Sequence, residues 1–307
     1  MSIGAYILRR LLWGVGVLVG VMVITFAVRY VLPADPARIV GGLHASPEVL
    51  AGIRRQYGFD RPLPAQLLAY AGNLLHGDFG MSLLYGTDVG TVLRTRGPQT
   101  IELVMAGLLV ALGAGLPLGV AAALRHASLV DRAAVLVALL SLSLPAFWLG
   151  PVLFAVFAVR LKALPADGST GLPALVIPAL TLGLAGIAWY TRLIRSSMLD
   201  ALGSDYIRTA RAKGLPWGQV VRTHALRNAI TPVVTQVGLD LGYLFGSVVV
   251  VEKAVGWPGI GQAAADAIAS DDPNLIMGVV LVGAVAVVLA NLAADVCRAL
   301  IDPRVRL

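Results

Sequence analysis

The sequence is poor in the residues that build disulfides and metal centres. Its 307 residues include one cysteine and four histidines. Because Cys297 stands alone, a disulfide within the chain and a metal site with several cysteine ligands are both excluded. The histidines, at positions 44, 76, 126 and 224, are scattered without the spacing of a metal site. We therefore predict no metal site, and no cofactor bound by this chain.

The sequence also lacks the motifs of catalysis. It contains no Gly-x-x-x-x-Gly-Lys-Ser/Thr phosphate-binding loop, no His-Glu-x-x-His motif and no nucleophile elbow. The pairs Gly14–Gly16 and Gly113–Gly115 lie in apolar runs, where glycine favours close packing of helices. The sequence predicts a protein that is not an enzyme. If its function consumes ATP, then ATP and Mg²⁺ are bound by separate ATPase chains.

Charged residues are scarce, at 13% of the chain, whereas hydrophobic residues make up 58%. This composition is too apolar for a soluble globular domain and indicates a polytopic membrane protein. A formal net charge of +7 raises the alternative of a nucleic-acid partner. However, the basic residues flank apolar runs and form no patch interleaved with aromatic residues. We attribute the charge to membrane orientation, and predict a lipid bilayer and no nucleic acid as partner.

Six apolar runs are about as long as the roughly 20 residues that span a bilayer. They cover residues 11–28, 103–124, 133–159, 172–191, 228–251 and 275–294. The sequence therefore predicts an all-α polytopic membrane protein with six transmembrane helices. Four prolines, Pro117, Pro145, Pro151 and Pro178, are expected inside helices, where bundle neighbours compensate the lost hydrogen bonds. Pro232 is expected near a helix start, where proline is tolerated.

Residues 32–98 differ from the apolar runs, because their charges are mixed and glycine and proline are frequent. Short amphipathic helices are predicted at 47–57 and 64–75. The chain then divides into an N-terminal transmembrane helix (1–31), a small extracytoplasmic subdomain (32–98) and a five-helix core (99–307) with a cytoplasmic loop at 200–230. Basic residues gather in the short loops of one side, which predicts that both termini lie in the cytoplasm.

The most basic stretch of the chain covers residues 205–232. Apolar and small residues recur at helical spacing in its first half, which predicts a short amphipathic helix. Gly214-Leu215-Pro216 then ends this helix, since glycine permits a left-handed turn and proline cannot continue the helix. A second helix follows. The charge pattern alone leaves two interpretations, a loop that only orients the protein and a docking element for a soluble partner.

This stretch resembles the cytoplasmic loop of permease subunits in binding-protein-dependent ABC importers, and most closely the subgroup that carries dipeptides, oligopeptides and nickel. The similar residues are 209–215, Thr-Ala-Arg-Ala-Lys-Gly-Leu, and 224–229, His-Ala-Leu-Arg-Asn-Ala. In that family the loop seats in a groove of the ATPase subunit and transmits its closure. The ATPase-coupling residues that the resemblance implies are Asp205, Arg208, Thr209, Ala210, Arg211, Lys213, Gly214, Leu215 and Pro216.

Two further segments resemble the same subgroup. The first covers residues 57–63 and 77–82, and the second covers 250–261 and continues to 271–273. The resemblance implies that both lie outside the cytoplasm, near the solute-binding protein. The outer-segment residues are Gly77, Asp78, Phe79, Gly80, Pro258, Gly259 and Gly261. The alternative is that these glycines and prolines are structural only.

The resemblance implies the type I ABC importer permease fold and a place in the bacterial cytoplasmic (inner) membrane. The chain is expected to be the first of two permeases and to form half of the path of an ATP-driven importer of di- or oligopeptides. The implied partners are a second permease, two ATPase subunits or domains, an extracytoplasmic solute-binding protein and the peptide substrate. The same architecture carrying nickel, glutathione or haem is an alternative.

A stand-alone channel or an ion-coupled carrier is the alternative of a different class. Such a protein is expected to carry more polar groups in its helices, or inverted repeats. The six apolar runs contain one aspartate, Asp240, and no obvious repeat. The sequence therefore favours the importer subunit.

Asp240 is the candidate residue for transport. An ionised group at mid-helix costs roughly 2.5–3.5 kcal/mol on insertion scales, so Asp240 is expected to face an interior or a watery cavity. Gln236 and Tyr243 share its helical face, and Asn291 in the last run is a further candidate for the path. Two interpretations stay open for Asp240. It meets an amino group of the substrate, or it is a structural carboxylate bonded to Ser, Thr or Tyr of a neighbouring helix.

Overall fold

The computed structural model describes residues 3–31, 36–42, 45–165 and 171–301. Over these residues the chain is nearly all helical and contains no strand, only an isolated bridge between Met81 and Asp88, so the all-α prediction is confirmed. Five helices are long and apolar enough to cross a membrane, or six if one sharply bent pair counts as a single span.

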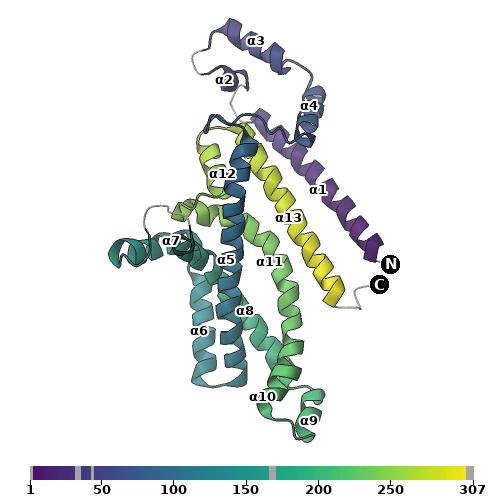
Figure 1. The fold of residues 1–307 in the computed structure, drawn as a ribbon, viewed down its shortest axis with the longest axis vertical. Helices are drawn as coiled ribbons and strands as arrows, with labels where there is room; N and C mark the ends of the chain where they lie inside the picture. Colours follow the sequence, from purple (N-terminus) through teal and green to yellow (C-terminus); the bar gives the residue numbers. More distant parts are fainter. Residues whose placement is uncertain (1–2, 32–35, 43–44, 166–170, 302–307) are drawn as a thin grey trace. The chain divides into compact units, whose positions relative to one another are not determined.

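The chain separates into two compact units. Unit 1 comprises Met1–Ile7, Ile101–Trp257 and Leu289–Leu307, and unit 2 comprises Leu8–Thr100 and Pro258–Val288. The helices of unit 1 are α6 (Leu129–Ser143), α7 (Ala146–Leu153), α8 (Leu172–Leu202), α9 (Asp205–Ala212), α10 (Trp217–Gln219) and α11 (Leu226–Val255), as drawn in Figure 1. Two long helices, α5 (Val89–Leu124) and α13 (Pro273–Ile301), contribute to both units.

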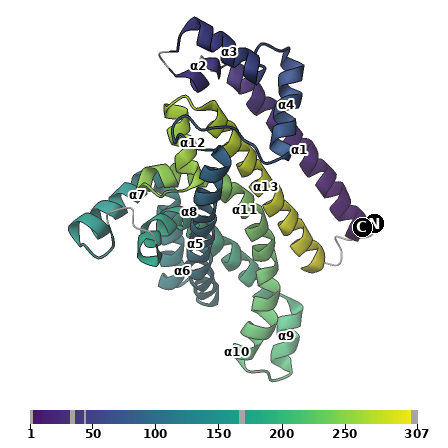
Figure 2. The same cartoon turned by 45° about the horizontal axis from the view of Figure 1, so that its top comes forward.

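Unit 2 contains α1 (Ile3–Val31) from Leu8 onward, α2 (Pro36–Gly41), α3 (Pro47–Tyr57), α4 (Leu63–Leu75) and α12 (Ile260–Ala269). In Figure 2, α2 and α3 lie at the C-terminal end of α1, and α1 runs beside α13. Close approach of these two long helices is possible because residue 14 is a glycine. A Cβ atom there would lie 2.8 Å from Cγ1 of Val288.

The helix predicted at 47–57 is present with those bounds as α3. Ser46 caps its N-terminus, accepting a 3.4 Å hydrogen bond from the backbone N–H of Val49. Gly58 ends it in the left-handed conformation, at φ 69°. The helix predicted at 64–75 is α4. These local cap signals explain why the bounds of α3 were predictable.

Helix α5 begins at Val89, well before the apolar run predicted from residue 103. The early turns of α5 are helical because they have their own buried face. Val89, Val92 and Leu93 pack in one cluster with Ala263 of α12 and Leu275 of α13. The predicted boundary at residue 98 therefore falls inside a continuous helix.

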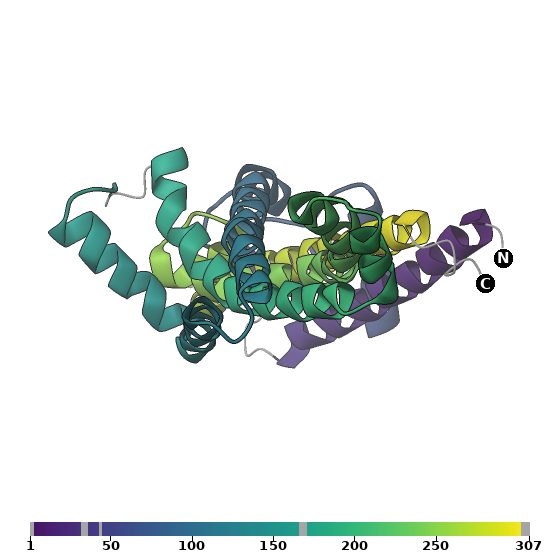
Figure 3. The same ribbon diagram turned by 90° about the horizontal axis from the view of Figure 1, so that it is seen from below.

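Pro145 does not lie inside a helix, so that prediction was wrong. Helix α6 ends at Ser143, Leu144 is extended at φ −92° and ψ 115°, and α7 starts after Pro145. A proline ring disfavours the helical conformation of the residue before it and removes one helical hydrogen bond. The chain bends there by 100°. Figure 3 shows α7 running sideways from the end of α6.

Pro232 also differs from its prediction, because it lies inside a helix and not near its start. The helix runs without interruption from Trp217 through a π-helical turn, Val220–Ala225, to Val255. Val220 and Ala225 are completely buried, so the second half of the basic stretch buries an apolar face, which allows the helix to continue through it. The many charged residues of this stretch make that apolar face hard to recognise from the sequence.

Helices α5 and α8 approach closely at glycines of both helices. A Cβ atom at Gly119 would overlap the carbonyl oxygen of Thr191, and one at Gly183 would reach the carbonyl oxygen of Gly107. The hydroxyl of Thr191 donates a 3.2 Å hydrogen bond to the carbonyl oxygen of Gly115. Small residues at such contacts are what allow helices to pack in a membrane. This contact packs α5 against α8, and both helices line the cavity described next.

Candidate functional site

Unit 1 contains a cavity of about 560 Å³. Five helices form it, α5, α6, α7, α8 and α11, and most of the lining is apolar. The lining side chains with polar atoms are Thr181, Trp189, Tyr190, Gln236, Asp240, Tyr243 and Ser247. The lining includes one carboxylate and no lysine, arginine or histidine. A largely apolar cavity with a few convergent polar groups is the usual form of a small-molecule site.

Asp240 of α11 is held by two neutral donors. The hydroxyl of Tyr190 on α8 donates a 2.7 Å hydrogen bond to Oδ2. The side-chain amide of Gln236, one turn away on α11, donates a 2.7 Å bond to Oδ1. The tyrosine bond expected of a structural carboxylate is therefore present, and the same carboxylate lines the cavity. Among the residues that the structure describes, Asp240 makes no ion pair.

The structure brings together three of the four residues predicted for the path. Gln236, Asp240 and Tyr243 all line the cavity, and Tyr243 is 75% exposed. Asn291 of α13 does not line it. Its side-chain amide lies against Gly242, where a Cβ atom would be 3.2 Å from Oδ1 of Asn291. Gly242 follows Asp240 by two residues and so faces nearly the opposite side of α11.

The predicted coupling loop is a short helix, a left-handed turn and a second helix. Ile207 and Ala210 are the buried face of α9. Gly214 has φ +79°, a conformation that favours glycine. Pro216 precedes α10, and Leu215 packs partly buried against the core. The other predicted residues, Asp205, Arg208, Thr209, Arg211 and Lys213, are exposed.

The exposed charged side chains of this loop make few stabilising contacts within the described part of the chain. Arg208 pairs with Asp205 at 3.2 Å, but both side chains are largely exposed, and such pairs contribute little to stability. The guanidinium of Arg211 lies 5.4 Å from the ring centre of Trp217. The loop thus has a packed inner face and a charged outer face, as a docking element requires.

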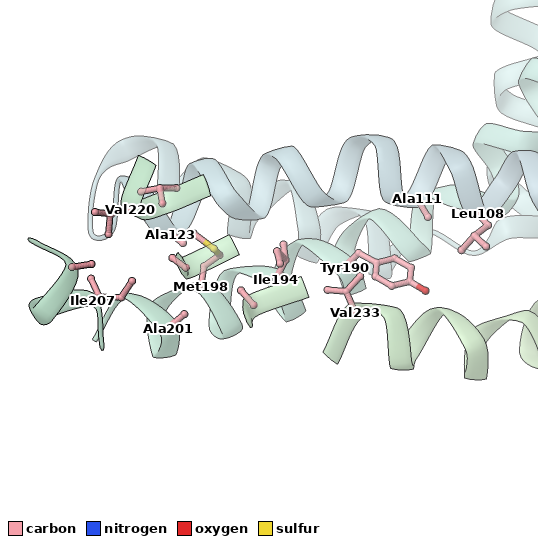
Figure 4. Close-up of a cluster of buried hydrophobic side chains, with 14 residues drawn as sticks. Leu108, Ala111, Ala123, Tyr190, Ile194, Met198, Ala201, Ile207, Val220 and Val233 are labelled. Atoms are coloured by element: carbon pink, nitrogen blue, oxygen red, sulfur yellow. The ribbon is translucent and has the colours of Figure 1, made fainter. Parts of the chain in front are cut away.

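One continuous apolar core joins this loop to the cavity. Buried residues of α9 (Ile207), α8 (Met198, Ile194, Tyr190) and α5 (Ala111, Leu108) belong to it. Figure 4 shows these side chains extending from Ile207 at one end to Tyr190, Ala111 and Leu108 at the other. Leu108, Ala111 and Tyr190 also line the cavity. A displacement of the loop would therefore be transmitted to the cavity wall, because close-packed side chains transmit strain.

The sequence interpretation missed a buried ion pair near the end of α5. Asp131 of α6 is almost fully buried and accepts hydrogen bonds from Nε of Arg195 at 2.6 Å and from its Nη2 at 2.8 Å. The ring of His126 lies 3.2 Å from the same carboxylate. Ser128, which caps α6 three residues before Asp131, was a local signal for the helix start. Nothing in the sequence indicated Arg195 as the partner.

The two predicted outer segments meet in unit 2. The hydroxyl of Ser82 donates a 2.6 Å hydrogen bond to the buried carboxylate of Asp272, and Asn274 donates a 2.9 Å bond to the carbonyl oxygen of Met81. The backbone N–H of Ile260 donates a 2.8 Å bond to the hydroxyl of Thr100.

The individual outer-segment residues build turns. Gly77 and Gly80 have φ near +80°, and Asp78 accepts a hydrogen bond from the N–H of Gly80. Phe79 packs, partly buried, against the hydrophobic cluster of unit 2. Pro258, the N-cap residue Gly259 and the buried Gly261 lie at the start of α12. Within the described part of the chain, no group of three potential metal ligands occurs in unit 2 or elsewhere.

Comparisons with known proteins cover nearly the whole chain. The family model of the binding-protein-dependent transport system inner membrane component matches residues 115–307, and the model of its N-terminal part matches residues 3–103. Glutathione transport system permease protein GsiC of Salmonella choleraesuis is 39% identical over 301 residues, covering 98% of both chains. GsiC of Escherichia coli K12 is 38% identical over the same length.

A solved structure of the MetNI methionine ABC transporter, in inward facing conformations, is similar in fold. The TM-score is 0.58 at 20% identity, and the match covers 69% of this chain and 96% of the other.

Proposed function

The chain belongs to the family of binding-protein-dependent transport system inner membrane components, and we propose that it forms half of an ATP-driven import path for short peptides, glutathione among them. It is a multi-pass inner-membrane permease of an ABC importer. Permeases of this family work with a second permease, with ATPase subunits that hydrolyse the ATP and with a binding protein.

The observation that carries the substrate proposal is the position of Asp240. Its carboxylate lines an apolar and aromatic cavity, and no cationic side chain lines that cavity. A carboxylate in such surroundings is stabilised by a cationic ligand group, and every peptide with a free N-terminus has an ammonium group. Glutathione is a tripeptide with one such group. The relatives named as glutathione permeases, 38–39% identical, support the same class of substrate.

Nickel and haem fit the cavity less well. The lining offers one carboxylate and no imidazole or thiol, the ligands that Ni²⁺ and haem iron prefer. A channel or an ion-coupled carrier does not explain the loop with a packed inner face and a charged outer face. We therefore retain short peptides as the substrate class.

The same proposal assigns roles to the remaining parts. Residues 205–216 dock on an ATPase subunit, and the core between Ile207 and Tyr190 carries the movement to the cavity. Residues 77–80 with Pro258, Gly259 and Gly261 lie outside the cytoplasm, near the binding protein. Residues 32–98 form the outer subdomain, and both termini lie in the cytoplasm. No cofactor is bound by this chain.

The test is uptake by the reconstituted complex. The chain is co-expressed with the second permease, the ATPases and the binding protein, and is placed in proteoliposomes. ATP-dependent accumulation of labelled glutathione or dialanine, with no accumulation of nickel, is expected. Accumulation of nickel or haem alone, or ATP-independent movement of solute by the isolated chain, would contradict the proposal. Deletion of residues 205–227 is expected to release the ATPases from the complex.

A further inference from the structure

Helix α4 of unit 2 contains no charged residue, although it belongs to the segment between α1 and α5, whose charges are mixed. Its sequence is Leu-Pro-Ala-Gln-Leu-Leu-Ala-Tyr-Ala-Gly-Asn-Leu-Leu. No residue of α4, which the structure describes in full, is buried. Leu68 is 73% exposed and Leu75 is 88% exposed. Contact of these leucines with water is unfavourable, so the exposed face of α4 requires a covering surface.

The orientation of α4 is the reverse of that of a helix on a water-soluble domain. The side-chain amide of Gln66 donates hydrogen bonds of 3.1 and 2.8 Å to two backbone carbonyl oxygens of the segment that joins α3 to α4. The ring of Tyr70, one turn further on, lies 6.0 Å from the ring of Phe26 on α1. Leu68 is two residues from both Gln66 and Tyr70, so it faces nearly the opposite side, and Leu75 follows it by two turns. The polar face of α4 therefore packs inward, and the leucine face points outward.

The preceding helix, α3, has the ordinary arrangement of a helix in water. Leu50 is buried, whereas Arg54, Arg55 and Gln56 are exposed. An amphipathic helix that meets water keeps its apolar face inside and its charged residues outside, as α3 does. The two neighbouring helices therefore differ in the solvent to which their outer faces are suited.

The contact with α1 places α4 at the end of a membrane span. Phe26 precedes Ala27, the last residue of the apolar span Ile7–Ala27. Figure 2 draws α4 beside α1. Tyr70, which contacts Phe26, therefore lies at the level where the hydrocarbon of the bilayer gives way to the headgroups. Tyrosine is enriched at this boundary, because its ring is apolar and its hydroxyl is polar.

We propose that α4 is a membrane-interface helix, whose Leu68–Leu75 face inserts between the lipids of the leaflet at the C-terminal end of α1. The helix thereby anchors the segment between α1 and α5 to the bilayer surface. The inference goes beyond the proposed function, since it depends on the membrane location of the chain and not on the imported solute.

Lipid suits this face better than a soluble protein does. A binding protein docks and leaves, so a surface kept for it meets water in part of each cycle, and an uncharged leucine face is then an aggregation hazard. Lipid covers the face at all times. The exposed side chain of Ile24 on α1, two residues before Phe26, lies near the same level of the bilayer, so the apolar surface of the span continues towards α4.

The experiment measures the depth of α4 in the purified permease–ATPase complex in nanodiscs. Single cysteines, Leu68→Cys and Leu75→Cys, are introduced separately in a Cys297→Ser background and labelled with a nitrobenzoxadiazole fluorophore. One quencher is a phospholipid with a nitroxide on its acyl chain close to the headgroup, and the other is iodide in the water. Ile24→Cys is the control within the span, and Gln56→Cys is the control on the outer face of α3.

An interfacial helix buries its apolar face by about 5–10 Å, which brings the labels within reach of the lipid nitroxide. The labels at residues 68 and 75 should lose most of their fluorescence to the lipid nitroxide and little to iodide, as the label at residue 24 does. The label at residue 56 should show the opposite preference. Testing the two leucines separately keeps the measurement valid if one variant assembles poorly.

Three results would overturn the inference. Quenching of both leucine labels by iodide, to the extent seen at residue 56, would show that α4 lies in water. Protection from both quenchers would show that another chain of the complex, such as the second permease, covers the face. Quenching by iodide that disappears when the binding protein is added would make that protein the occupant. None of these results bears on which solute the importer carries.

Discussion

The hydroxyl of Tyr190 donates a 2.7 Å hydrogen bond to the carboxylate of Asp240, which joins α8 to α11. The ring of Tyr190 is buried in the apolar core that begins at Ile207 of the coupling loop. One side chain thus contacts the core on one side and the cavity on the other. If residues 205–216 move with an ATPase subunit, as we propose, this position makes Tyr190 the residue that carries the movement to the cavity.

Tyr190→Phe is expected to destabilise the complex without abolishing assembly. The ring still fills the core, but Oδ2 of Asp240 loses its donor, which costs about 1–3 kcal/mol. The measurement is the thermal unfolding midpoint of the detergent-solubilised complex. Tyr243→Phe is the matched control, because within the described part of the chain the Tyr243 hydroxyl makes no hydrogen bond and its side chain is 75% exposed. Equal midpoints for the two variants would show that the Tyr190 bond contributes nothing.

Gly214→Val is expected to uncouple ATP hydrolysis from transport. Gly214 has φ +79° with no atom near its missing Cβ, so a side chain meets strain and not a clash. Forcing a residue with a side chain into this conformation costs roughly 1–2 kcal/mol and changes the turn between α9 and α10. The number of peptides imported per ATP hydrolysed should fall.

Gly218→Ala is the control for the coupling loop. This glycine is helical and also has open space around it, so alanine should be neutral or slightly stabilising. If Gly214→Val transports with the same yield per ATP as Gly218→Ala does, the conformation of this turn is irrelevant to coupling.

Arg195→Gln is expected to lower the thermal midpoint markedly. It leaves the almost fully buried carboxylate of Asp131 without its cationic partner, and an uncompensated buried charge is strongly destabilising. Arg208→Gln breaks the exposed pair with Asp205 and should leave the midpoint nearly unchanged. A similar small effect of both substitutions would mean that water reaches Asp131 and compensates its charge.

Asp272→Asn is expected to loosen the contact between the two outer segments of unit 2. Asp272 is fully buried and accepts hydrogen bonds from the hydroxyl of Ser82 and the backbone N–H groups of Leu84 and Leu275. An asparagine amide cannot accept all three, which costs about 1.5–3 kcal/mol. The thermal midpoint and the rate of limited proteolysis report the loss. Asp271→Asn, at the exposed neighbouring residue, should change neither.

The sequence by itself determined the features that depend on neighbours along the chain. Apolar runs set the membrane-spanning helices, because a bilayer requires a continuous apolar segment. Ser46 and Gly58 set the bounds of α3, because caps act within one turn. Spacing on one helix placed Gln236 and Tyr243 beside Asp240, and the basic stretch contained its own helix break at Gly214.

Only the tertiary structure decided which distant residues meet. Tyr190 reaches Asp240, Arg195 reaches Asp131, and Ser82 reaches Asp272 across 190 positions. Such partners are set by helix packing, which no local pattern specifies. The same reason explains the misplaced boundaries. Whether a helix continues through residue 98 or residue 228, or breaks at Pro145, depends on whether its next turn finds a surface to bury against, and the neighbouring helices provide that surface.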